Sequence, residues 1–262
     1  MRGIVIPIFD KYESIALANL QRIRTDFRVD LPLEVWEAGR EISDGCRADL
    51  GRLGNITFRN VADHVGGWQD WRGYHIKAFA AKFTQFDEFL LCDADLTFVR
   101  DPTIIFSNLR YRRTGTFFFR DFHYWKFEKL SADSTDKLTS LTFFLGRREW
   151  LRKILPDRPR MFPFSWRYIY SDRVPRRPVA EAYMESGAVY LDRSRHADTI
   201  DTVFRLNNEG REETHRYTLG EKESWWIACC MCKKDFAMNV RYPAAKPRLT
   251  QFYGLREFYI QK

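Results

Sequence analysis

The chain has 262 residues, which is enough for one large domain or two small ones and for a sizeable hydrophobic core. Hydrophobic residues make up 45% of it and charged residues 30%, which excludes a disordered chain. The net charge of +8 favours anionic partners, among them nucleotides, nucleic acids, acidic lipids and acidic glycans.

The apolar runs and the cysteines bear on where the protein works. No apolar run is long enough to cross a bilayer, so no transmembrane segment is expected. The five cysteines are odd in number and three of them are crowded together, which does not suit a disulfide framework. These observations favour a soluble, cytoplasmic protein, with a trimmed Golgi luminal domain as the alternative.

The first 125 residues alternate between short apolar runs and helical stripes. The apolar runs have the length of buried strands and occupy residues 3–9, 33–36, 56–61, 88–92 and 115–119. Between them, one apolar stripe runs from Ala16 to Phe27 and another from Ile76 to Phe83, each at the spacing of a helix face. Strands that alternate with helices predict an α/β fold with a mixed, mainly parallel central sheet.

The second half of the chain is less regular. Residues 147–178 are rich in arginine and proline, which predicts long surface connections in place of helices or central strands. Residues 187–191 are a further strand candidate, and Trp225, Ala228 and Cys229 share the spacing of a helix. After Tyr242 no clear element is predicted.

Two aspartates follow directly after the apolar run 88–92. Asp93 and Asp95 are one residue apart, so an extended chain would point both carboxylates to one side, about 7 Å apart. They stand at the carboxyl end of a predicted parallel strand, where open α/β sheets bind their ligands. Two carboxylates there suit Mg²⁺ or Mn²⁺ shared with a diphosphate. The alternative interpretation is a solvated turn after a strand.

The sequence around these aspartates resembles that of the GT-A glycosyltransferases. The similar segments are, in chain order, residues 73–79 (GYHIKAF), 86–95 (FDEFLLCDAD), 100–102 (RDP), 115–121, 185–196 and 220–226. Their order is most similar to the yeast-type α-1,3-mannosyltransferases, which build outer mannose onto glycans. Each segment is weak by itself, and the ordered set, which covers residues 73–228, is fairly specific.

The resemblance implies a GT-A fold, a nucleotide-sugar donor, Mn²⁺ or Mg²⁺, and retention of the anomeric configuration. It assigns the metal and the donor diphosphate to Asp93 and Asp95, and a donor-side position to Lys77. It places three glutamates near the reacting sugar: Glu185, Glu221 and Glu223. A carboxylate there would stabilise an oxocarbenium-like centre or accept the proton of the acceptor hydroxyl, and the three glutamates are not told apart.

The resemblance also bears on the loop after the first strand. In GT-A folds this loop meets the nucleotide, so Tyr12 would stack on the base and Asp10 would hold a hydroxyl. An ordinary turn is the equal alternative. Many GT-A enzymes add a late histidine to the metal, but His215 is the last histidine here and precedes the segment 220–226, which leaves the third ligand unassigned.

Taken with the resemblance, the sequence predicts a single GT-A domain over residues 1–262. Residues 1–125 would form its nucleotide-sugar-binding half and residues 126–262 its acceptor-side half. The predicted function is metal-dependent transfer of a sugar from a nucleotide-diphosphate donor to a glycan hydroxyl. GDP-mannose is the first choice of donor, a UDP-sugar is the competitor, and no nucleic acid partner is expected.

Two other functions stay open at this point. One is a non-catalytic glycan- or nucleic-acid-binding protein on a decayed transferase fold. The other is a metal-dependent nucleotidyl or phosphoryl enzyme, which also uses paired aspartates. The spacing of Cys229 and Cys232 is interpreted as core packing because no second pair of zinc ligands follows it. The scattered arginines of residues 110–177 are interpreted as a solvated face.

Overall fold

The structure is a computed structural model, and it describes residues 1–120, 141–155, 184–218 and 220–239, together with short strands at 244–245, 251–255 and 258–261. Its centre is a six-stranded sheet with the strand order β3-β2-β1-β4-β7-β6. The strands are β1 (Arg2–Pro7), β2 (Leu33–Glu37), β3 (Ile56–Asn60), β4 (Glu88–Cys92), β6 (Thr116–Arg120) and β7 (Met184–Asp192). The first four are parallel, whereas β7 runs antiparallel to both β4 and β6.

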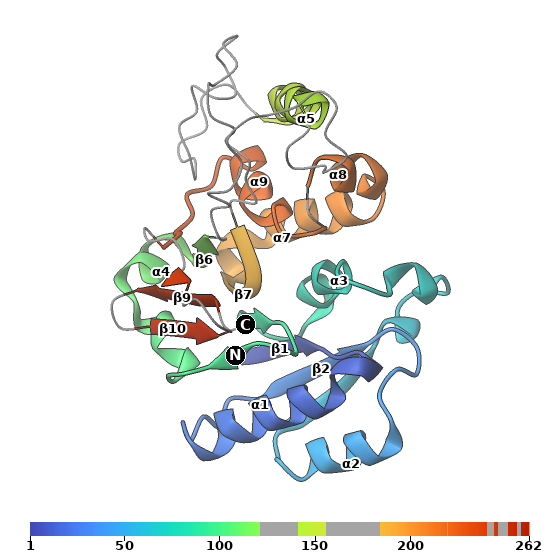
Figure 1. Ribbon diagram of the computed structural model, residues 1–262, viewed down its shortest axis with the longest axis vertical. Coiled ribbons are helices and arrows are strands. Elements are labelled where there is room, and N and C mark those ends of the chain that lie inside the picture. Colours follow the sequence, from blue (N-terminus) through green and yellow to red (C-terminus); the bar gives the residue numbers. More distant parts are fainter. Residues whose placement is uncertain are drawn as a thin grey trace.

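Helices cover both faces of this sheet (Figure 1). The helices α1 (Glu13–Thr25) and α2 (Asp44–Gly51) pack on one face. The helices α3 (Ile76–Phe83), α7 (Arg193–Asn207) and α9 (Ser224–Met231) pack on the other. Along β4, Phe89 and Leu91 join the core under α3, and Leu90 and Cys92 join the core under α1. This alternation is why a strand buried on both faces appears as a continuous apolar run. The predicted α/β architecture with a mixed, mainly parallel sheet is confirmed.

A smaller sheet joins the far end of the chain to the segment after β4. It has the order β5-β10-β9-β8 and is antiparallel throughout. Its strands are β5 (Thr97–Phe98), β8 (Ala244–Ala245), β9 (Gln251–Leu255) and β10 (Phe258–Gln261). The prediction of no element after Tyr242 is therefore wrong. These strands are short, and β10 pairs with a segment far away in the sequence, so local periodicity gives no sign of them.

The prediction of surface connections over residues 147–178 is wrong for its first part. The helix α5 (Leu141–Ile154) occupies that part and contacts α8 (Arg211–Tyr217), with the rings of Trp150 and Tyr217 stacked at 5.6 Å. The prolines that prompted the prediction begin only at Pro156, after the helix has ended. Residues 156–178 lie outside the described part of the chain.

Several further helices were not predicted. They are α2, α7, α8 and the short helix α4 (Leu109–Thr114). α2, α4 and α8 are short, and α7 carries many polar residues, so none of them shows a long apolar stripe. Within the described residues, no helix is both long enough and apolar enough to span a membrane.

Candidate active site

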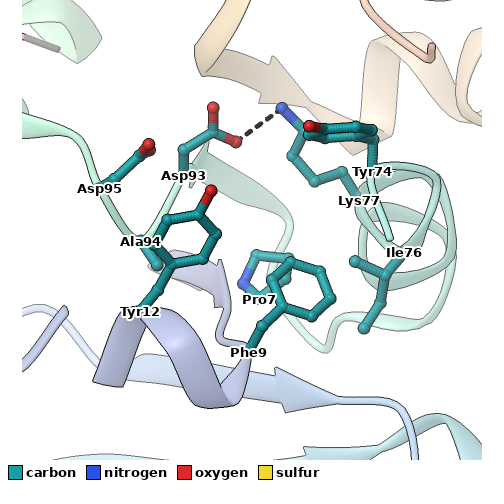
Figure 2. A pocket seen from close by; sticks show the side chains of 9 residues that line it. All are labelled: Pro7, Phe9, Tyr12, Tyr74, Ile76, Lys77, Asp93, Ala94 and Asp95. Atoms are coloured by element: carbon teal, nitrogen blue, oxygen red, sulfur yellow. Dashed lines mark hydrogen bonds and ion pairs between the residues drawn. The ribbon is translucent and has the colours of Figure 1, made fainter. Parts of the chain in front are cut away.

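A pocket opens at the carboxyl ends of β1 and β4 (Figure 2). Strand β1 and the loop after it contribute Pro7, Phe9 and Tyr12 to one wall of the pocket. The start of α3 and the segment after β4 form the other walls. The other residues that line the pocket come from the start of α3 and the residues just before it, and from the segment after β4: Tyr74, Ile76, Lys77, Asp93, Ala94 and Asp95. Aromatic rings therefore face two carboxylates across one small cavity. This is the edge of an α/β sheet at which ligands bind.

Asp93 and Asp95 reach this pocket through a turn. Asp93 is the first residue after β4, and the alternation of the strand carries its side chain to the face of α3, as for Leu91. The chain then turns at residues 94–95, where the amide of Leu96 donates to the carbonyl of Asp93 at 3.2 Å. The expected extended arrangement of the two aspartates is therefore wrong. Both carboxylates nevertheless face the pocket, because the turn presents Asp95 beside Asp93.

The side chain of Asn19 supports this turn from beneath. Its Nδ2 donates to the carbonyl of Ala94 at 3.0 Å, and its Oδ1 accepts from the hydroxyl of Thr97 at 2.7 Å. Asn19 is buried in α1, on the face that packs against the sheet. The helix on one face of the sheet thus fixes the backbone between the two pocket aspartates.

Lys77 is the centre of the charged groups in the pocket. Its side chain is buried, and its Nζ lies 2.7 Å from Asp93 Oδ1 and 2.6 Å from Glu221 Oε1. It also donates to the carbonyl and the hydroxyl of Ser186, at 2.9 Å and 2.8 Å. Burial lowers the pKa of Lys77, but the two carboxylates, Asp93 and Glu221, more than offset that effect and raise the pKa above its usual value. Lys77 is therefore a permanent cation between two carboxylates.

Glu221 joins a distant part of the chain to this centre. Its carboxylate is buried and accepts a hydrogen bond from the Ser186 hydroxyl at 2.6 Å, in addition to the ion pair with Lys77. The preceding residue, Gly220, has φ +64° and packs against Tyr74 at the pocket wall. This left-handed turn, which favours glycine, brings the start of α9 beside α3.

Glu185 lies on the same side of the site. Its Oε1 accepts from the amide of Gly187 at 2.8 Å, and its Oε2 pairs with Lys222 Nζ at 2.9 Å. Gly187 stands between Glu185 and Asp93, since a Cβ on it would lie 3.2 Å from Glu185 Oε1 and 3.6 Å from Asp93 Oδ2. The absence of a side chain at Gly187 lets these two carboxylates lie close to each other.

Glu223 and Asp10 are placed differently from the other predicted site residues. The buried carboxylate of Glu223 accepts from the amide of Met184 at 3.4 Å and from the indole of Trp226, and it pairs with Arg147 at 3.4 Å. These contacts tie β7, α9 and α5 together. Asp10 is exposed, its carboxylate accepts from the amide of the next residue, Lys11, and it is not among the pocket-lining residues.

Three contributors to the site were not singled out in the sequence. Tyr74 lines the pocket with a largely exposed ring, Ser186 bridges Lys77 and Glu221, and Lys222 neutralises Glu185. Ser186 and Lys222 stand next to predicted residues, so the motifs at 185–187 and 220–223 contained the signal. Nothing in the local pattern around Tyr74 separates it from an ordinary helix start.

The donor atoms of the pocket fit a divalent cation of the Mg²⁺ or Mn²⁺ type. Asp93 and Asp95 supply hard carboxylate oxygens at the mouth of the cavity, and Lys77 engages Oδ1 of Asp93. Among the residues that the structure describes, no group of three or more histidine, cysteine or acidic side chains converges as a metal cage. Such an ion would therefore take its other ligands from water and from a bound diphosphate, as Mg²⁺ commonly does.

A family comparison decides where this chain belongs. Residues 1–255 match the family described as "Mannosyltransferase putative". The chain belongs to this mannosyltransferase family. The match extends over both halves of the chain and includes the pocket aspartates, Lys77 and the glutamates of β7 and α9. The resemblance to α-1,3-mannosyltransferases that the sequence motifs indicate is confirmed.

Curated relatives of this mannosyltransferase family member come from Candida albicans. The relative named "Putative alpha-1,3-mannosyltransferase MNN12" is 27% identical over 191 residues, which cover 72% of this chain and 21% of the relative. "Putative alpha-1,3-mannosyltransferase MNN1" is 23% identical over 297 residues, which cover 95% of this chain and 34% of the relative. The chain thus spans about a fifth to a third of the length of these relatives.

Solved structures with the same fold include two mannosyltransferases. Core-mannan synthase A (CmsA/Ktr4) of Aspergillus fumigatus, in its Mn/GDP form, superposes with a TM-score of 0.54 at 9% identity, covering 98% of this chain and 75% of that one. Ktr4p of S. cerevisiae, in complex with GDP, superposes with a TM-score of 0.51 at 9% identity, covering 90% of this chain and 66% of that one. The mannosyltransferase family member described here has the GT-A fold.

Proposed function

We propose that this protein transfers mannose from GDP-mannose to a hydroxyl group of a glycan, with a divalent cation and with retention of configuration. The observation that carries the proposal is the buried Lys77, which lines the pocket with Asp93 and links this metal-side carboxylate to Glu221, a buried carboxylate outside the pocket lining. The membership in a mannosyltransferase family supports mannose as the sugar. The GDP bound in two structures of the same fold supports guanosine as the nucleoside.

The two walls of the pocket suit the two ends of a nucleoside diphosphate, the base on the β1 side and the diphosphate beside the aspartates. The aromatic side chains of Phe9 and Tyr12 on the β1 side offer flat surfaces for the base. Asp10, which lies between them in the chain and outside the pocket lining, is the proposed partner of a ribose hydroxyl. On the opposite wall, Asp93 and Asp95 would hold the cation against the diphosphate oxygens. When bound, the cation would offset the negative charge that develops on the departing nucleotide.

Lys77 would act as a positioning residue for Asp93. Its ammonium engages Asp93 Oδ1 and Glu221 Oε1, and it offsets the repulsion between these two carboxylates in a buried setting. Because the hydroxyl and the carbonyl of Ser186 also accept from it, the ammonium is held from several directions. Asp93 is therefore presented in one orientation before any ligand arrives, which favours catalysis by preorganisation.

The two glutamates that lie beside Asp93 are the proposed carboxylates of the reacting centre. Glu185 and Glu221 approach the pocket from β7 and from the start of α9, whereas Glu223 holds these elements together. In the transfer, the bond from the anomeric carbon to the diphosphate breaks and a bond to the acceptor oxygen forms. The proton of the acceptor hydroxyl passes to a carboxylate or to an oxygen of the departing diphosphate. A carboxylate beside the oxocarbenium-like centre stabilises its positive charge.

Calorimetric titration of GDP and UDP tests the donor site. Each nucleotide is added with Mn²⁺ and again with EDTA, to the wild-type protein, to Asp95→Asn and to a control, Asp49→Asn, which changes an exposed aspartate of α2 that pairs with Arg52. We expect metal-dependent GDP binding that Asp95→Asn removes and Asp49→Asn leaves intact. Release of GDP from GDP-mannose in the presence of an α-mannoside acceptor, with the product anomer read by NMR, then tests transfer and retention.

Other outcomes of this experiment would overturn parts of the proposal. Preferential binding of UDP would replace GDP-mannose by a UDP-sugar. Binding of neither nucleotide would favour a non-catalytic glycan-binding protein on a transferase fold. Cleavage of nucleotides that does not depend on a sugar acceptor would favour a phosphoryl or nucleotidyl enzyme, for which paired aspartates and a metal are also suitable.

A further inference from the structure

A second cavity lies away from the donor pocket, where three helices meet. Its walls are the end of α4, the start of α7 and the turn that follows α9, and its volume is about 420 Å³. Four of its lining side chains are cationic, and one is a carboxylate. They are Arg113, Arg195, Lys233 and Lys234, with Asp235 as the carboxylate. We call this cavity the basic cleft.

The basic cleft and the donor pocket lie at opposite ends of the ladder between β4 and β7. In that ladder Cys92 pairs with Ala188, next to the donor pocket, and Glu88 pairs with Asp192, next to the first residues of α7. The two sites are therefore separated by about 17 Å, the length of a five-residue strand. A ligand in the basic cleft does not occupy the donor site.

The floor of the basic cleft is built from side chains that are fixed by hydrogen bonds. Arg195 donates to the carbonyl of Arg112 at 2.9 Å and to that of Arg113, at the end of α4. His196 is buried, and its ring nitrogens lie 2.7 Å from the carbonyl of Thr114 and 3.2 Å from the hydroxyl of Thr199. These contacts join α4 to α7 and hold the cleft open in one shape.

Two of the cations have no such structural task. Arg113 and Lys233 are exposed, and neither side chain has an ion pair or a hydrogen bond within the part of the chain that the structure describes. Lys234, by contrast, pairs with Asp198 at 3.3 Å and donates to the carbonyl of Arg195. The basic cleft thus combines a fixed floor with two unneutralised charges at its rim.

The backbone of Lys233 is in the left-handed conformation. Lys233 has φ +55° and ends α9, with its amide donating to the carbonyl of Cys230 and the next amide to that of Cys229. This is the left-handed position at which helices usually place glycine, because a side chain there is strained. The side chain of Lys233 lines the cleft from this position, and a glycine there would remove the charge without straining the backbone.

We infer that the basic cleft is a second anion site, which binds a phosphate group. Phosphate matches it because an arginine and a lysine can each donate charge-assisted hydrogen bonds to phosphate oxygens. The amino end of α7 is already capped by the carboxylate of Asp192, which accepts from the amide and the hydroxyl of Ser194, so the attraction for an anion comes from the cationic side chains. The phosphate belongs to a soluble phosphate compound or to a lipid headgroup. In both cases the molecule that carries it would bind at the end of the sheet opposite the pocket beside Asp93.

Binding of inorganic pyrophosphate, measured by calorimetry in EDTA, tests this site apart from the metal-dependent donor site. We expect saturable binding that weakens roughly tenfold in Lys233→Gly and in Arg113→Gln, since each loses a charge-assisted hydrogen bond. Lys233→Gly also relieves the strained backbone, so a loss of binding would not arise from unfolding. Asp235→Asn should tighten binding about two- to threefold, which damage to the fold would not do.

The matched control is Arg28→Gly. Arg28 is also an exposed basic residue with positive φ, at +53°, and it follows α1, on the other face of the sheet from α7. Its replacement removes the same charge and relieves the same strain without touching the basic cleft. If Arg28→Gly weakens binding as much as Lys233→Gly, the inference is wrong.

Sedimentation with vesicles separates the two sources of phosphate. Phosphatidylcholine vesicles that contain phosphatidic acid are compared with vesicles of phosphatidylcholine alone. Binding to the anionic vesicles that Lys233→Gly removes and Arg28→Gly keeps would identify a lipid headgroup. Saturable binding of pyrophosphate without binding to either vesicle would identify a soluble phosphate compound. Either result supports the site, and failure of both ligands to bind overturns it without affecting the proposed transferase activity.

Discussion

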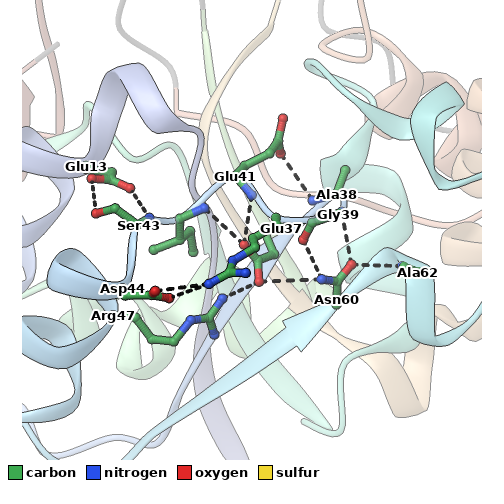
Figure 3. A network of polar contacts seen from close by, with 12 residues as sticks. Glu13, Glu37, Ala38, Gly39, Glu41, Ser43, Asp44, Arg47, Asn60 and Ala62 are labelled. Atoms are coloured by element: carbon green, nitrogen blue, oxygen red, sulfur yellow. Dashed lines mark hydrogen bonds and ion pairs between the residues drawn. The ribbon is translucent and has the colours of Figure 1, made fainter.

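Two buried polar networks stand at the same edge of the central sheet, and they are assembled in opposite ways. In the first, Glu37 at the end of β2 accepts from the amides of Glu41 and Ile42, at 3.1 Å and 3.0 Å, and pairs with Arg47 (Figure 3). In the second, Lys77 binds Asp93, Ser186 and Glu221, which come from three separate segments. The Glu37 network shapes one local loop, whereas the Lys77 network exists only when the whole fold is in place.

The difference bears on which network suits the proposed catalytic site. A loop closed by its own neighbours, such as the one around Glu37, forms with little loss of chain entropy, because few residues separate the partners. The carboxylates around Lys77 are held by different elements. Their positions are therefore set by the place of β7 in the sheet and by the packing of α3 and α9 against that sheet. Rigid elements fix reacting groups more accurately than loops do.

The largest expected effect comes from removing the central cation. Lys77→Met should leave the buried Glu221 and the partly exposed Asp93 as carboxylates that repel each other, lowering the free energy of unfolding by about 3–5 kcal/mol and abolishing transfer. Denaturation by urea measures the first effect, and release of GDP from GDP-mannose the second. The double variant Lys77→Met/Glu221→Gln should recover part of the stability and none of the activity. Full activity in Lys77→Met would contradict the positioning role of this lysine.

A smaller effect is expected in the local network. Glu37→Gln replaces an ionised acceptor by an amide, so the ion pair with Arg47 is lost while the surrounding amides still point at the side chain. We expect the free energy of unfolding to fall by about 1–3 kcal/mol. Affinity for GDP and Mn²⁺ should stay within a few-fold of the wild-type value, since Glu37 does not line the donor pocket. A loss of nucleotide binding as large as that of Asp95→Asn would show that the two networks are not separate.

Gly187→Ala sharpens the comparison by disturbing the Lys77 site without removing a charge. The added methyl group would lie 3.2 Å from Glu185 Oε1, so the Glu185 carboxylate must shift by a few tenths of an ångström, whereas its 3.6 Å distance from Asp93 Oδ2 is an ordinary contact. We expect kcat to fall about tenfold or more because small displacements at a reacting centre lower the rate strongly. The melting temperature should change little.

The control for this substitution is Gly45→Ala in α2. An added Cβ there meets no atom within 4 Å, and alanine favours the helix over glycine. This variant should gain about 0.5–1 kcal/mol of stability with unchanged kcat. Equal losses of activity in the two glycine variants would remove the argument for a close approach at Gly187.

The smallest expected effect concerns pH and the buried His196. Burial lowers the pKa of His196 below its usual value of 6.5, although its hydrogen bond to Thr114 acts in the opposite direction. His196 therefore binds a proton less readily in the folded state than in the unfolded state. Its contribution to stability is fully present above pH 6.5 and is lost as the pH falls through the lower pKa of the folded state.

Urea denaturation between pH 5 and pH 7.5 measures this dependence. The free energy of unfolding should decrease toward the acid side in the wild type, and less so in His196→Gln, which can keep both hydrogen bonds without a proton to gain. A similar acid dependence in both proteins would assign it to other groups, among them His75, whose pKa is also lowered by burial.

Much of the sheet could be predicted because most of its strands are buried on both faces. Short apolar runs in the sequence correspond to β1, β2, β3, β4 and β6, and apolar stripes at helical spacing correspond to α1 and α3. The alternation of strands with helices predicts parallel pairing. The strand candidate at residues 187–191 became the centre of β7. The direction of β7, antiparallel to β4, follows from long-range pairing that no local pattern contains.

The candidate site could be predicted as a set of residue types but not as an arrangement. The position of Asp93 and Asp95 directly after a buried strand predicts that they lie at the edge of the sheet. The turn between them is supported by a hydrogen bond from Asn19 in α1, which the local sequence does not show. The three glutamates are equivalent in the sequence. In the structure, Glu221 contacts Lys77, Glu185 lies beside Asp93, and Glu223 faces Trp226 and Arg147. Only packing separates these roles.

The sequence by itself determined the α/β class, the order of the buried strands and the acidic end of β4, because apolar periodicity and its interruption are local properties. The tertiary structure decided which charges meet. It placed Lys77 between carboxylates from distant segments, and it gathered Arg113, Arg195 and Lys233, which are scattered along the chain, around one cleft. Contacts between remote residues depend on how helices pack on the sheet, which the spacing of residues along the chain does not specify.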